Sequence, residues 1–367
     1  MNILIDAHVF DSKHQGTRTY LKGLYTELIP LAVNWHFYFA ANNTENLKTE
    51  FGEHPNVTYV TLKSNNKFYR LLMEFPEIIK KNQIDFAHYQ YISPIFKNCK
   101  QIITTHDILF EQKEFKKFFP LKYRIINGLL FKLSAKRADV LLTVSEYSKN
   151  KIAEIYKIES NLIGITPNAV SNAYFDSKEL NTVPNINLGK YILYVSRVEP
   201  RKNHLNLLKA FVELQLAIKG YKLVCIGKKD ILFSDLKNYI NQIEPMHSES
   251  ILWIENISNK DLMAYYKNCE LFVFPSFAEG FGIPPLEAMA MGSKVLCSKD
   301  TAMADFNLPD SLTFDPHNVE ELKQKIEKQL ENDEVLTEVY KNILANYNWT
   351  NVAKTFYNHI LHHQKKQ

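Results

Sequence analysis

Close pairs of cysteine are missing from this chain of 367 residues. Its four cysteines, Cys99, Cys225, Cys269 and Cys297, are far apart in the sequence, which excludes a closely spaced zinc motif and a clustered disulfide framework. Isolated cysteines are typical of a reducing compartment. Internal repeats and low-complexity tracts are also lacking, and 46% apolar and 23% charged residues are ordinary globular proportions. The composition therefore excludes fibrous and disordered proteins.

Long hydrophobic runs are absent as well, since no stretch approaches the roughly 18 apolar residues of a membrane span. The first residues, MNILIDAHVF, place Asp6 within an apolar run and lack a basic leader and a small-residue cleavage site. We expect them to form a first strand rather than a signal peptide. A net charge of +4 is too small to indicate a nucleic-acid-binding protein. We therefore expect a cytoplasmic protein.

Short β-rich runs alternate with helical stretches along the chain, which predicts an α/β fold with parallel sheets covered on both faces. A representative helical stretch is 17–29, where apolar residues recur at helical spacing. No Gly-x-Gly-x-x-Gly follows the first strand, which disfavours a dinucleotide-dependent oxidoreductase. The predicted strands are 2–5, 36–40, 57–62, 84–88, 101–105, 140–144, 162–166, 191–195, 222–226, 251–253, 271–274 and 294–297.

The alternation is interrupted once, at DSKELNTVPNINLGK, residues 176–190, which is polar and has no periodicity. We interpret this segment as a linker between two Rossmann-like domains, 1–175 and 191–348. Two domains also suit the length of the chain. Ligands of open α/β sheets bind at the carboxyl ends of the strands, so we expect the site in a cleft that both domains face.

Polar residues follow two of the strands predicted for the first domain. Gly16 lies between the first strand and a helix, where a glycine lets the backbone approach a ligand and a helix N-terminus attracts an anion. His106 and Asp107 follow the strand 101–105. A histidine beside an acid at the ligand-binding edge is a candidate functional residue, and Asp107 either orients it or caps the next segment of the chain.

Cations follow the first strand of the second domain, in YVSRVEPRKNH. Arg197 ends this strand, and Lys202 stands five residues on, where a helix begins. If both cations and the positive end of the helix point toward the same place, they would bind a negatively charged diphosphate there. The neighbouring Arg201 favours the simpler interpretation of a solvated basic turn.

Two glutamates, Glu279 and Glu287, stand in FAEGFGIPPLEAMAMG, residues 277–292. The paired prolines predict the start of a short helix and the final glycine predicts its end. We therefore expect Glu287 in the first helical turn and Glu279 in the preceding loop. A helix N-terminus favours a carboxylate and explains Glu287 by itself, but it explains neither Glu279 nor the glycines on both sides of Phe281.

A basic stretch runs from Lys113 to Arg137, with eight Lys or Arg residues and one acid, Glu114. The simpler interpretation is a solvated helix with a core stripe at Ile125, Leu129 and Leu133. The alternative is a surface that contacts an anionic membrane, where basic groups bind headgroups and aromatic side chains insert. The interleaved aromatic residues are Phe115, Phe118, Phe119, Tyr123 and Phe131.

These motifs together resemble the retaining glycosyltransferases of the GT-B fold, in the group 1 family (family 4-like), which includes many bacterial mannosyl- and glucosyltransferases. EGFGIPPLEAMAMG is similar to the family's Glu-x7-Glu signature, and SRVEPRKN to its Arg-x4-Lys diphosphate clamp. TVSEYSKNKI and ITPNAV are similar to the end of its first domain. The resemblance covers 1–349 and is strongest over 191–298. It also implies that 349–367 forms a helix that crosses back to the first domain.

The resemblance implies a donor site on the second domain. Glu279 would accept hydrogen bonds from the hydroxyls of the donor sugar, and Glu287 would bind the ribose of the nucleotide. Arg197 and Lys202 would neutralise the leaving diphosphate, because preorganised cations stabilise the charge that develops there. Backbone groups beside the first glutamate would assist, at Gly280, Phe281 and Gly282.

On the first domain, the resemblance implies that the amide of Gly16 reaches the phosphates and that His106 contacts the sugar near the anomeric carbon. The loop at Gln15, Gly16 and Thr17 has one glycine where many relatives have two. No metal and no further cofactor is expected, because the cations replace a divalent ion and no Asp-x-Asp is present.

We therefore expect a retaining, metal-independent hexosyltransferase that uses GDP-mannose, or a UDP-sugar as second choice. The acceptor would be a glycan or lipid-linked glycan of cell-surface polysaccharide or lipopolysaccharide biosynthesis. Both a front-face mechanism and a double displacement agree with the sequence. The alternatives are a nucleotide-sugar epimerase of the same fold and a non-catalytic sugar-nucleotide-binding protein. Membrane contact through 113–137 would place the protein at the inner face of the cell membrane.

Overall fold

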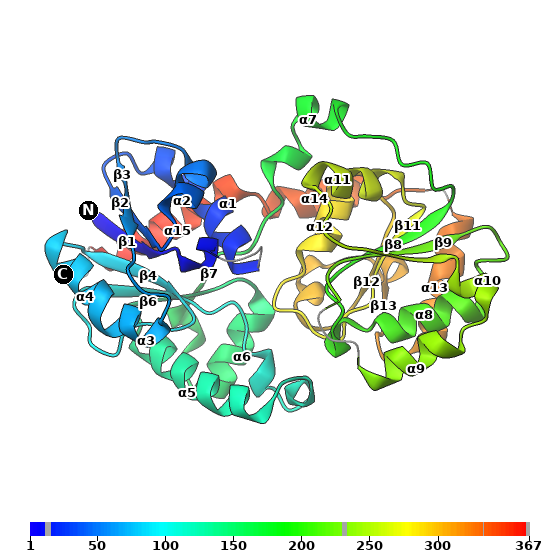
Figure 1. Ribbon diagram of the computed structural model, residues 1–367, viewed down its shortest axis with the longest axis horizontal. Coiled ribbons are helices and arrows are strands. Elements are labelled where there is room, and N and C mark those ends of the chain that lie inside the picture. Colours follow the sequence, from blue (N-terminus) through cyan, green and yellow to red (C-terminus); the bar gives the residue numbers. More distant parts are fainter. Residues whose placement is uncertain (12–15, 230–232, 333, 365–367) are drawn as a thin grey trace. The chain divides into compact units, whose positions relative to one another are not determined.

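The computed structural model describes residues 1–11, 16–229, 233–332 and 334–364 (Figure 1). The chain divides into two compact units. The N-terminal unit consists of Met1–Ala169 and Tyr347–Gln367, and the C-terminal unit is Val170–Asn346. The segment interpreted as a linker lies in the C-terminal unit and contains a short helix, α7 (Ser177–Asn181).

The N-terminal unit is built on a parallel sheet of seven strands in the order β3-β2-β1-β4-β5-β6-β7. All five residues of β4 are buried, as expected for a strand with helices on both faces. The predicted strands of this half are present, with ends shifted by at most two residues. They are β1 (Asn2–Asp6), β2 (His36–Ala41), β3 (Val57–Thr61), β4 (Phe86–Gln90), β5 (Lys100–Thr104), β6 (Val140–Thr143) and β7 (Ile163–Ile165).

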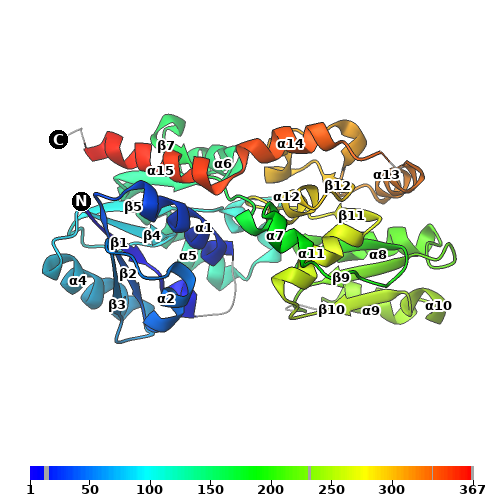
Figure 2. The same ribbon diagram turned by 90° about the horizontal axis from the view of Figure 1, so that it is seen from above.

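Helices cover both faces of this sheet. On one face α1 packs along α15, the C-terminal helix, which belongs to this unit (Figure 2). The contact is close, because a Cβ built on Gly23 of α1 would lie 2.0 Å from the Trp349 ring. The helices are α1 (Gly16–Leu31), α2 (Thr44–Phe51), α3 (Lys67–Tyr69), α4 (Phe75–Lys81), α5 (Leu121–Arg137), α6 (Glu146–Tyr156) and α15 (Trp349–Gln364).

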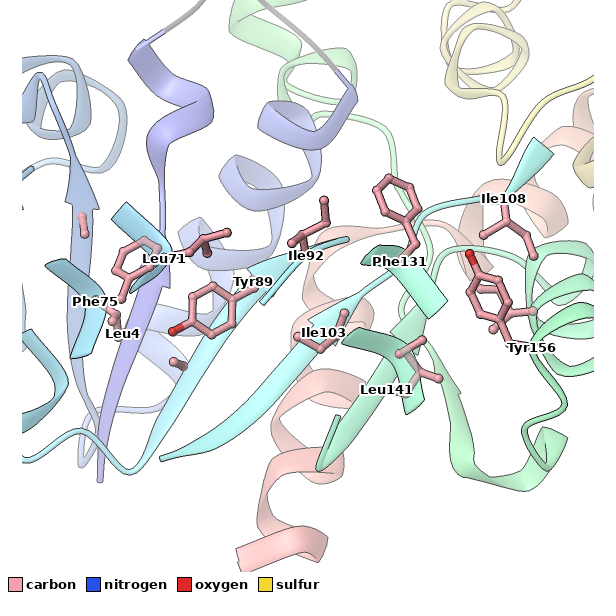
Figure 3. Packing of buried hydrophobic residues seen from close by; sticks show 14 of the residues in the cluster. Leu4, Leu71, Phe75, Tyr89, Ile92, Ile103, Ile108, Phe131, Leu141 and Tyr156 are labelled. Carbon is pink, nitrogen blue, oxygen red and sulfur yellow. The ribbon is translucent and has the colours of Figure 1, made fainter. Parts of the chain in front are cut away.

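On the other face a hydrophobic cluster joins the sheet to α4, α5 and α6 (Figure 3). Helix α5 contributes Phe131 and Ala135 to this cluster. The core stripe predicted for this helix is wrong, because Ile125, Leu129 and Leu133 are 64%, 62% and 46% exposed. Apolar residues occupy both sides of α5, so their spacing does not show which side faces the core.

The C-terminal unit has a parallel sheet of six strands in the order β10-β9-β8-β11-β12-β13, which confirms the predicted α/β class with two Rossmann-like halves. Strand β13 was not predicted, because its two residues are too short for an apolar run. The strands are β8 (Tyr191–Val195), β9 (Lys222–Ile226), β10 (Ile251–Ile254), β11 (Leu271–Phe274), β12 (Val295–Ser298) and β13 (Thr313–Phe314).

In the C-terminal unit, the helices from α8 to α12 connect the parallel strands, and α13 and α14 follow the last strand, β13. Among the described residues, no helix of either unit is long and apolar enough to cross a membrane. The helices are α8 (His204–Glu213), α9 (Ser234–Gln242), α10 (Pro245–Ser248), α11 (Asn259–Asn268), α12 (Ile283–Ala290), α13 (Val319–Glu331) and α14 (Thr337–Asn346).

Each sheet has one point at which the strand order reverses direction. It lies between β1 and β4 in the N-terminal unit and between β8 and β11 in the C-terminal unit. Ligands of open α/β sheets bind beyond the carboxyl ends of the strands at such a point. The loops after these four strands are therefore where the fold itself places a site.

Candidate functional site

A cluster of charged side chains lies at the reversal point of the C-terminal unit. The loop after β8 forms a short 3-10 turn, Pro200–Lys202, before α8 begins. Asn203 follows this turn in the left-handed conformation, with φ of 57°. Its Nδ2 donates to the carbonyl oxygens of Pro275 and Pro316, at 3.0 and 2.9 Å. Asn203 therefore fixes the loop after β11 beside the loop after β8.

Glu279, in the loop after β11, is the centre of this cluster. Its carboxylate accepts from Nζ of Lys202 at 2.5 Å and from Nη1 of Arg201 at 3.1 Å. Its own N–H donates to the Thr301 hydroxyl at 3.0 Å. The residue is only 6% exposed, so its side chain lies beneath the surface of the loop.

Burial and pairing act in opposite directions on the two charges. Burial raises the pKa of Glu279, but the Lys202 and Arg201 charges outweigh it and hold the pKa below its ordinary value. Burial lowers the pKa of Lys202, with a further contribution from Arg201, and the Glu279 carboxylate opposes both. Charges removed from water persist when they are paired and hydrogen-bonded. We therefore interpret the contact as an ion pair.

Arg201 was interpreted as a sign of a solvated turn, and this was wrong. Its Nη1 donates to the carbonyl oxygen of Ala278 at 3.0 Å as well as to Glu279, and its Nε donates to Glu199 at 2.9 Å. The second carboxylate oxygen of Glu199 lies 2.9 Å from Nη2 of Arg197. The Arg197 side chain is 58% exposed, so it is the accessible cation of the group.

The other glutamate of the pair, Glu287, lies on α12 near a tyrosine of α11. The hydroxyl of Tyr266 donates to Oε2 of Glu287 at 2.9 Å, and Tyr174 also hydrogen-bonds the carboxyl group. Helix α12 begins at Ile283, so Glu287 lies in its second turn and not in the first turn as predicted. Burial raises the pKa of Glu287 to about 7, although the two tyrosine hydroxyls lower it.

The segment between the two glutamates forms the N-terminus of α12. Gly282 caps the helix with φ of 95°, a conformation that side chains other than glycine rarely adopt. Phe281 is buried, with its ring edge against Phe306 at 5.8 Å between centroids. Gly280 precedes it. The two prolines of the first turn have no N–H, so few donors of this helix end need partners.

A third loop approaches the same cluster. Gly227 follows β9 with φ of 147°, and a Cβ built there would lie 2.1 Å from the carbonyl oxygen of Ser196. The backbones of the loops after β8 and β9 therefore touch next to Arg197. Only glycine fits this contact.

His106 lies in the N-terminal unit, after β5. Its Nε2 is 2.7 Å from Oε1 of Gln90, the last residue of β4, and the Tyr20 ring packs edge-on at 5.0 Å. Burial lowers the pKa of His106 to about 3, so the imidazole is neutral at physiological pH. Asp107 accepts from the N–H of Leu109 at 3.1 Å, which is a local cap.

Gly16 is the first residue of α1. Among the described residues, a Cβ built there would meet no atom within 4 Å, so none of them requires a glycine at this position. Gln15 and the three residues before it lie outside the described residues, and Thr17 follows in the helix. Over the described ranges, no group of three or more His, Cys, Asp or Glu side chains could hold a metal ion.

Sequence reasoning missed Asn203 and Tyr266 and misjudged Arg201. Asn203 gave a weak signal, because asparagine tolerates the left-handed conformation at the start of a helix. Tyr266 gave none, since its contact with Glu287 spans 21 positions and depends on how α11 packs on α12.

Comparison with known proteins agrees with the sequence motifs. The family model "Glycosyl transferases group 1" matches residues 177–345, and the model "Glycosyltransferase Family 4" matches residues 15–173. O-antigen chain mannosyltransferase B of Escherichia coli is 28% identical over 264 residues, which cover 68% of this chain and 67% of that protein. O-antigen chain mannosyltransferase RfbU of Salmonella typhimurium is 28% identical over 264 residues, with 71% and 69% covered.

Solved structures share the fold at low identity. Sucrose-phosphate synthase from Thermosynechococcus elongatus aligns with a TM-score of 0.74 and 18% identity over 100% of this chain and 99% of that chain. Anabaena HepE, in complex with UDP and glucose, aligns with a TM-score of 0.68 and 17% identity, covering 98% and 99%.

Proposed function

The chain belongs to the group 1 glycosyltransferases of the GT-B fold, and from this premise we propose that it is a retaining hexosyltransferase. The donor is a nucleotide-diphosphate sugar, with GDP-mannose as first choice and a UDP-sugar as second. The acceptor is a glycan or lipid-linked glycan of cell-surface polysaccharide or lipopolysaccharide biosynthesis. The two relatives that are named as O-antigen chain mannosyltransferases support mannose and this class of product.

The observation that carries the proposal is the buried contact of Glu279 with Lys202 and Arg201. These side chains come from the loops after β8 and β11, where the strand order reverses. With Arg197, the group has three cations against the carboxylates of Glu279 and Glu199. A net positive, preorganised cluster stabilises a diphosphate that gains charge as the sugar leaves.

Each remaining residue has a role in this proposal. Glu279 binds hydroxyls of the donor sugar while it orients Lys202, and Glu287 binds the ribose as a carboxylate. The backbone of Gly280, Phe281 and Gly282 assists the sugar contact. Gly16 brings an amide to the phosphates, and the neutral His106 hydrogen-bonds the sugar without carrying a charge.

The reaction needs no metal ion in this proposal, because the arginine and lysine side chains neutralise the diphosphate. Configuration is retained most simply by a front-face path, in which a phosphate oxygen of the donor takes the proton of the acceptor hydroxyl. Double displacement through a covalent intermediate is the competing mechanism. The enzyme acts in the cytoplasm, at the inner face of the cell membrane where a lipid-linked acceptor is available.

A panel of nucleotide sugars tests the proposal with the whole purified chain. GDP-mannose or a UDP-sugar should raise the melting temperature, because a ligand that binds only the native state stabilises it. Release of the nucleotide diphosphate should then follow with that donor, and Glu279→Gln should lower its rate by about 100-fold or more. Epimerisation of the donor sugar without release of the nucleotide would favour the epimerase. Binding of the nucleotide sugar without turnover, whether or not an extract that contains acceptor is added, would favour a binding protein. Full activity of the variant would refute the proposed site.

A further inference from the structure

Exposed hydrophobic side chains are concentrated in one part of the N-terminal unit. Twelve of the eighteen large hydrophobic residues that are exposed among the described residues lie between Phe68 and Leu133. Single exposed apolar residues are normal, but a concentration of them indicates an interaction surface. Six of the twelve are on α5: Leu121, Tyr123, Ile125, Ile126, Leu129 and Leu133.

Helix α5 presents aliphatic and basic side chains on the side opposite the core. Its buried residues are Phe131, Ser134 and Ala135, which define the inward side. At 100° per residue, the outward side carries five aliphatic residues and four cations. We call these residues the α5 face: Leu121, Lys122, Ile125, Ile126, Leu129, Lys132, Leu133, Lys136 and Arg137.

The charge of the α5 face points to an anionic partner. The sequence of α5 contains no acidic residue. Asp139, just beyond the helix, pairs with Lys97 at 2.8 Å. A second copy of the chain, placed face to face on the same surface, would bring cations against cations with no acid between them. Self-association through this face is therefore disfavoured.

Further apolar residues lie beside the C-terminal end of α5. Nη2 of Arg137 donates to the carbonyl oxygen of Ile95 at 2.6 Å, which ties the loop after β4 to the helix. Ile95 and Phe96 of this loop are 59% and 69% exposed. These two side chains therefore add exposed apolar area beside the α5 face.

Exposed apolar side chains also lie on the neighbouring helical segment, residues 67–74. Phe68 and Met73 are each 59% exposed, and they flank Leu71, which packs into the same hydrophobic cluster as Phe131 of α5. This segment and α5 therefore cover the same face of the sheet. Figure 1 shows α3, α4 and α5 along that side of the unit.

We propose that the α5 face, together with Ile95 and Phe96, docks on the surface of an anionic lipid bilayer. The lysine and arginine heads bind lipid phosphates while the aliphatic side chains enter the boundary of the acyl chains. Two aromatic residues of the basic stretch, Phe115 and Phe131, are buried and take no part in this surface. The inference deepens the proposed placement at the membrane by naming the surface that binds lipid, and its test is separate from transferase activity, since lipid binding is measured without any substrate.

Vesicle flotation with the whole purified chain tests the proposal. We expect recovery with vesicles that contain about a third phosphatidylglycerol, and little recovery with pure phosphatidylcholine. Each basic group near an anionic surface contributes about 1 kcal/mol. The double variant K122E/K136E should therefore lose at least about 30-fold in partitioning, and I125Q/L129Q should also lose recovery, because their apolar area no longer inserts.

Matched variants on other surfaces serve as controls. K237E/K354E makes the same charge change on exposed lysines of α9 and α15, and L162Q/I218Q replaces aliphatic residues that are 63% and 57% exposed. Both controls should float like the wild type. The proposal would be overturned if control and test variants lost recovery equally, or if the wild type did not bind anionic vesicles. It would also be overturned if light scattering showed a dimer that I125Q/L129Q dissociates.

Discussion

Nζ of Lys202 lies 2.5 Å from Oε1 of Glu279, although 77 positions separate the two residues. The contact exists because β8 and β11, which precede them, are neighbours in the sheet despite lying far apart in the chain. Asn203 strengthens the junction by binding the loop after β11. The pair is thus a product of topology, and its removal tests both the stability and the activity of the site.

Glu279→Gln should reduce both the stability of the protein and its transferase activity. The substitution keeps the shape of the side chain but leaves Lys202 and Arg201 buried without their carboxylate, which costs about 3 kcal/mol of unfolding free energy. Misplaced cations should also lower turnover of the donor by about 100-fold or more. Urea unfolding and nucleotide release measure the two effects.

Glu213→Gln is the control for this variant. Glu213 also pairs with a lysine, Lys323, but its side chain is 46% exposed, and exposed pairs contribute little. Its stability and turnover should match those of the wild type. If Glu279→Gln behaves like this control, the buried pair does not organise the site.

Arg201→Lys and Arg197→Lys should distinguish a residue that holds the site together from one that only binds the ligand. Arg201 uses its fork on three acceptors, in Glu199, Ala278 and Glu279, which a single ammonium cannot reproduce. Its replacement should lower both the melting temperature and turnover. Arg197 is accessible, so its replacement should raise the KM for the donor and leave the melting temperature within about 1 °C. Equal melting temperatures for both variants would contradict the role of Arg201.

The raised pKa of Glu287 predicts a dependence of stability on pH. Between pH 4.5 and about 7 the folded protein keeps a proton that the unfolded chain has lost. Stability therefore falls as the pH rises through this window, by at most about 3 kcal/mol. Glu287→Gln does not titrate, so the wild type should lose stability relative to this variant from pH 4.5 to 7. Urea unfolding at several pH values measures the difference.

Tyr266→Phe provides the matching control for this titration. The Tyr266 hydroxyl lowers the pKa of Glu287, so its loss should raise the pKa and extend the falling limb to higher pH. If ribose binds the carboxylate, nucleotide affinity should also increase as the pH rises past 7. A difference between wild type and Glu287→Gln that is constant with pH would show that Glu287 does not titrate in this range.

Apart from β13, the sequence was sufficient for the described strands and for the residue types at their ends, because both are local properties. It was insufficient for contacts between distant loops. Arg201 was discounted because nothing near it in the chain shows that Ala278 and Glu279 lie opposite. The side of α5 that was predicted to face the core was also wrong. This helix has apolar residues on both sides, so the helical spacing of Ile125 and Leu129 does not show whether their side faces the core or the solvent.

Two glycines of α1 should respond differently to alanine. At Gly23 a Cβ would lie 2.0 Å from the Trp349 ring, so α15 must move away from α1. Overpacking of this kind costs about 1–3 kcal/mol or more, and the better helix propensity of alanine returns only about 1 kcal/mol. Gly23→Ala should therefore lower the melting temperature, and a second substitution, Trp349→Leu, should partly relieve the clash in a double variant.

Gly16→Ala is the counterpart, because its Cβ would meet no atom of the described residues within 4 Å. Its stability should change by less than about 0.5 kcal/mol. If the Gly16 amide approaches the donor phosphates, the added methyl group should weaken nucleotide binding about tenfold while the melting temperature of the free protein stays constant. Calorimetric titration with the nucleotide diphosphate measures this affinity. Unchanged affinity would remove Gly16 from the proposed site, and a lower melting temperature would show that the glycine serves the fold instead.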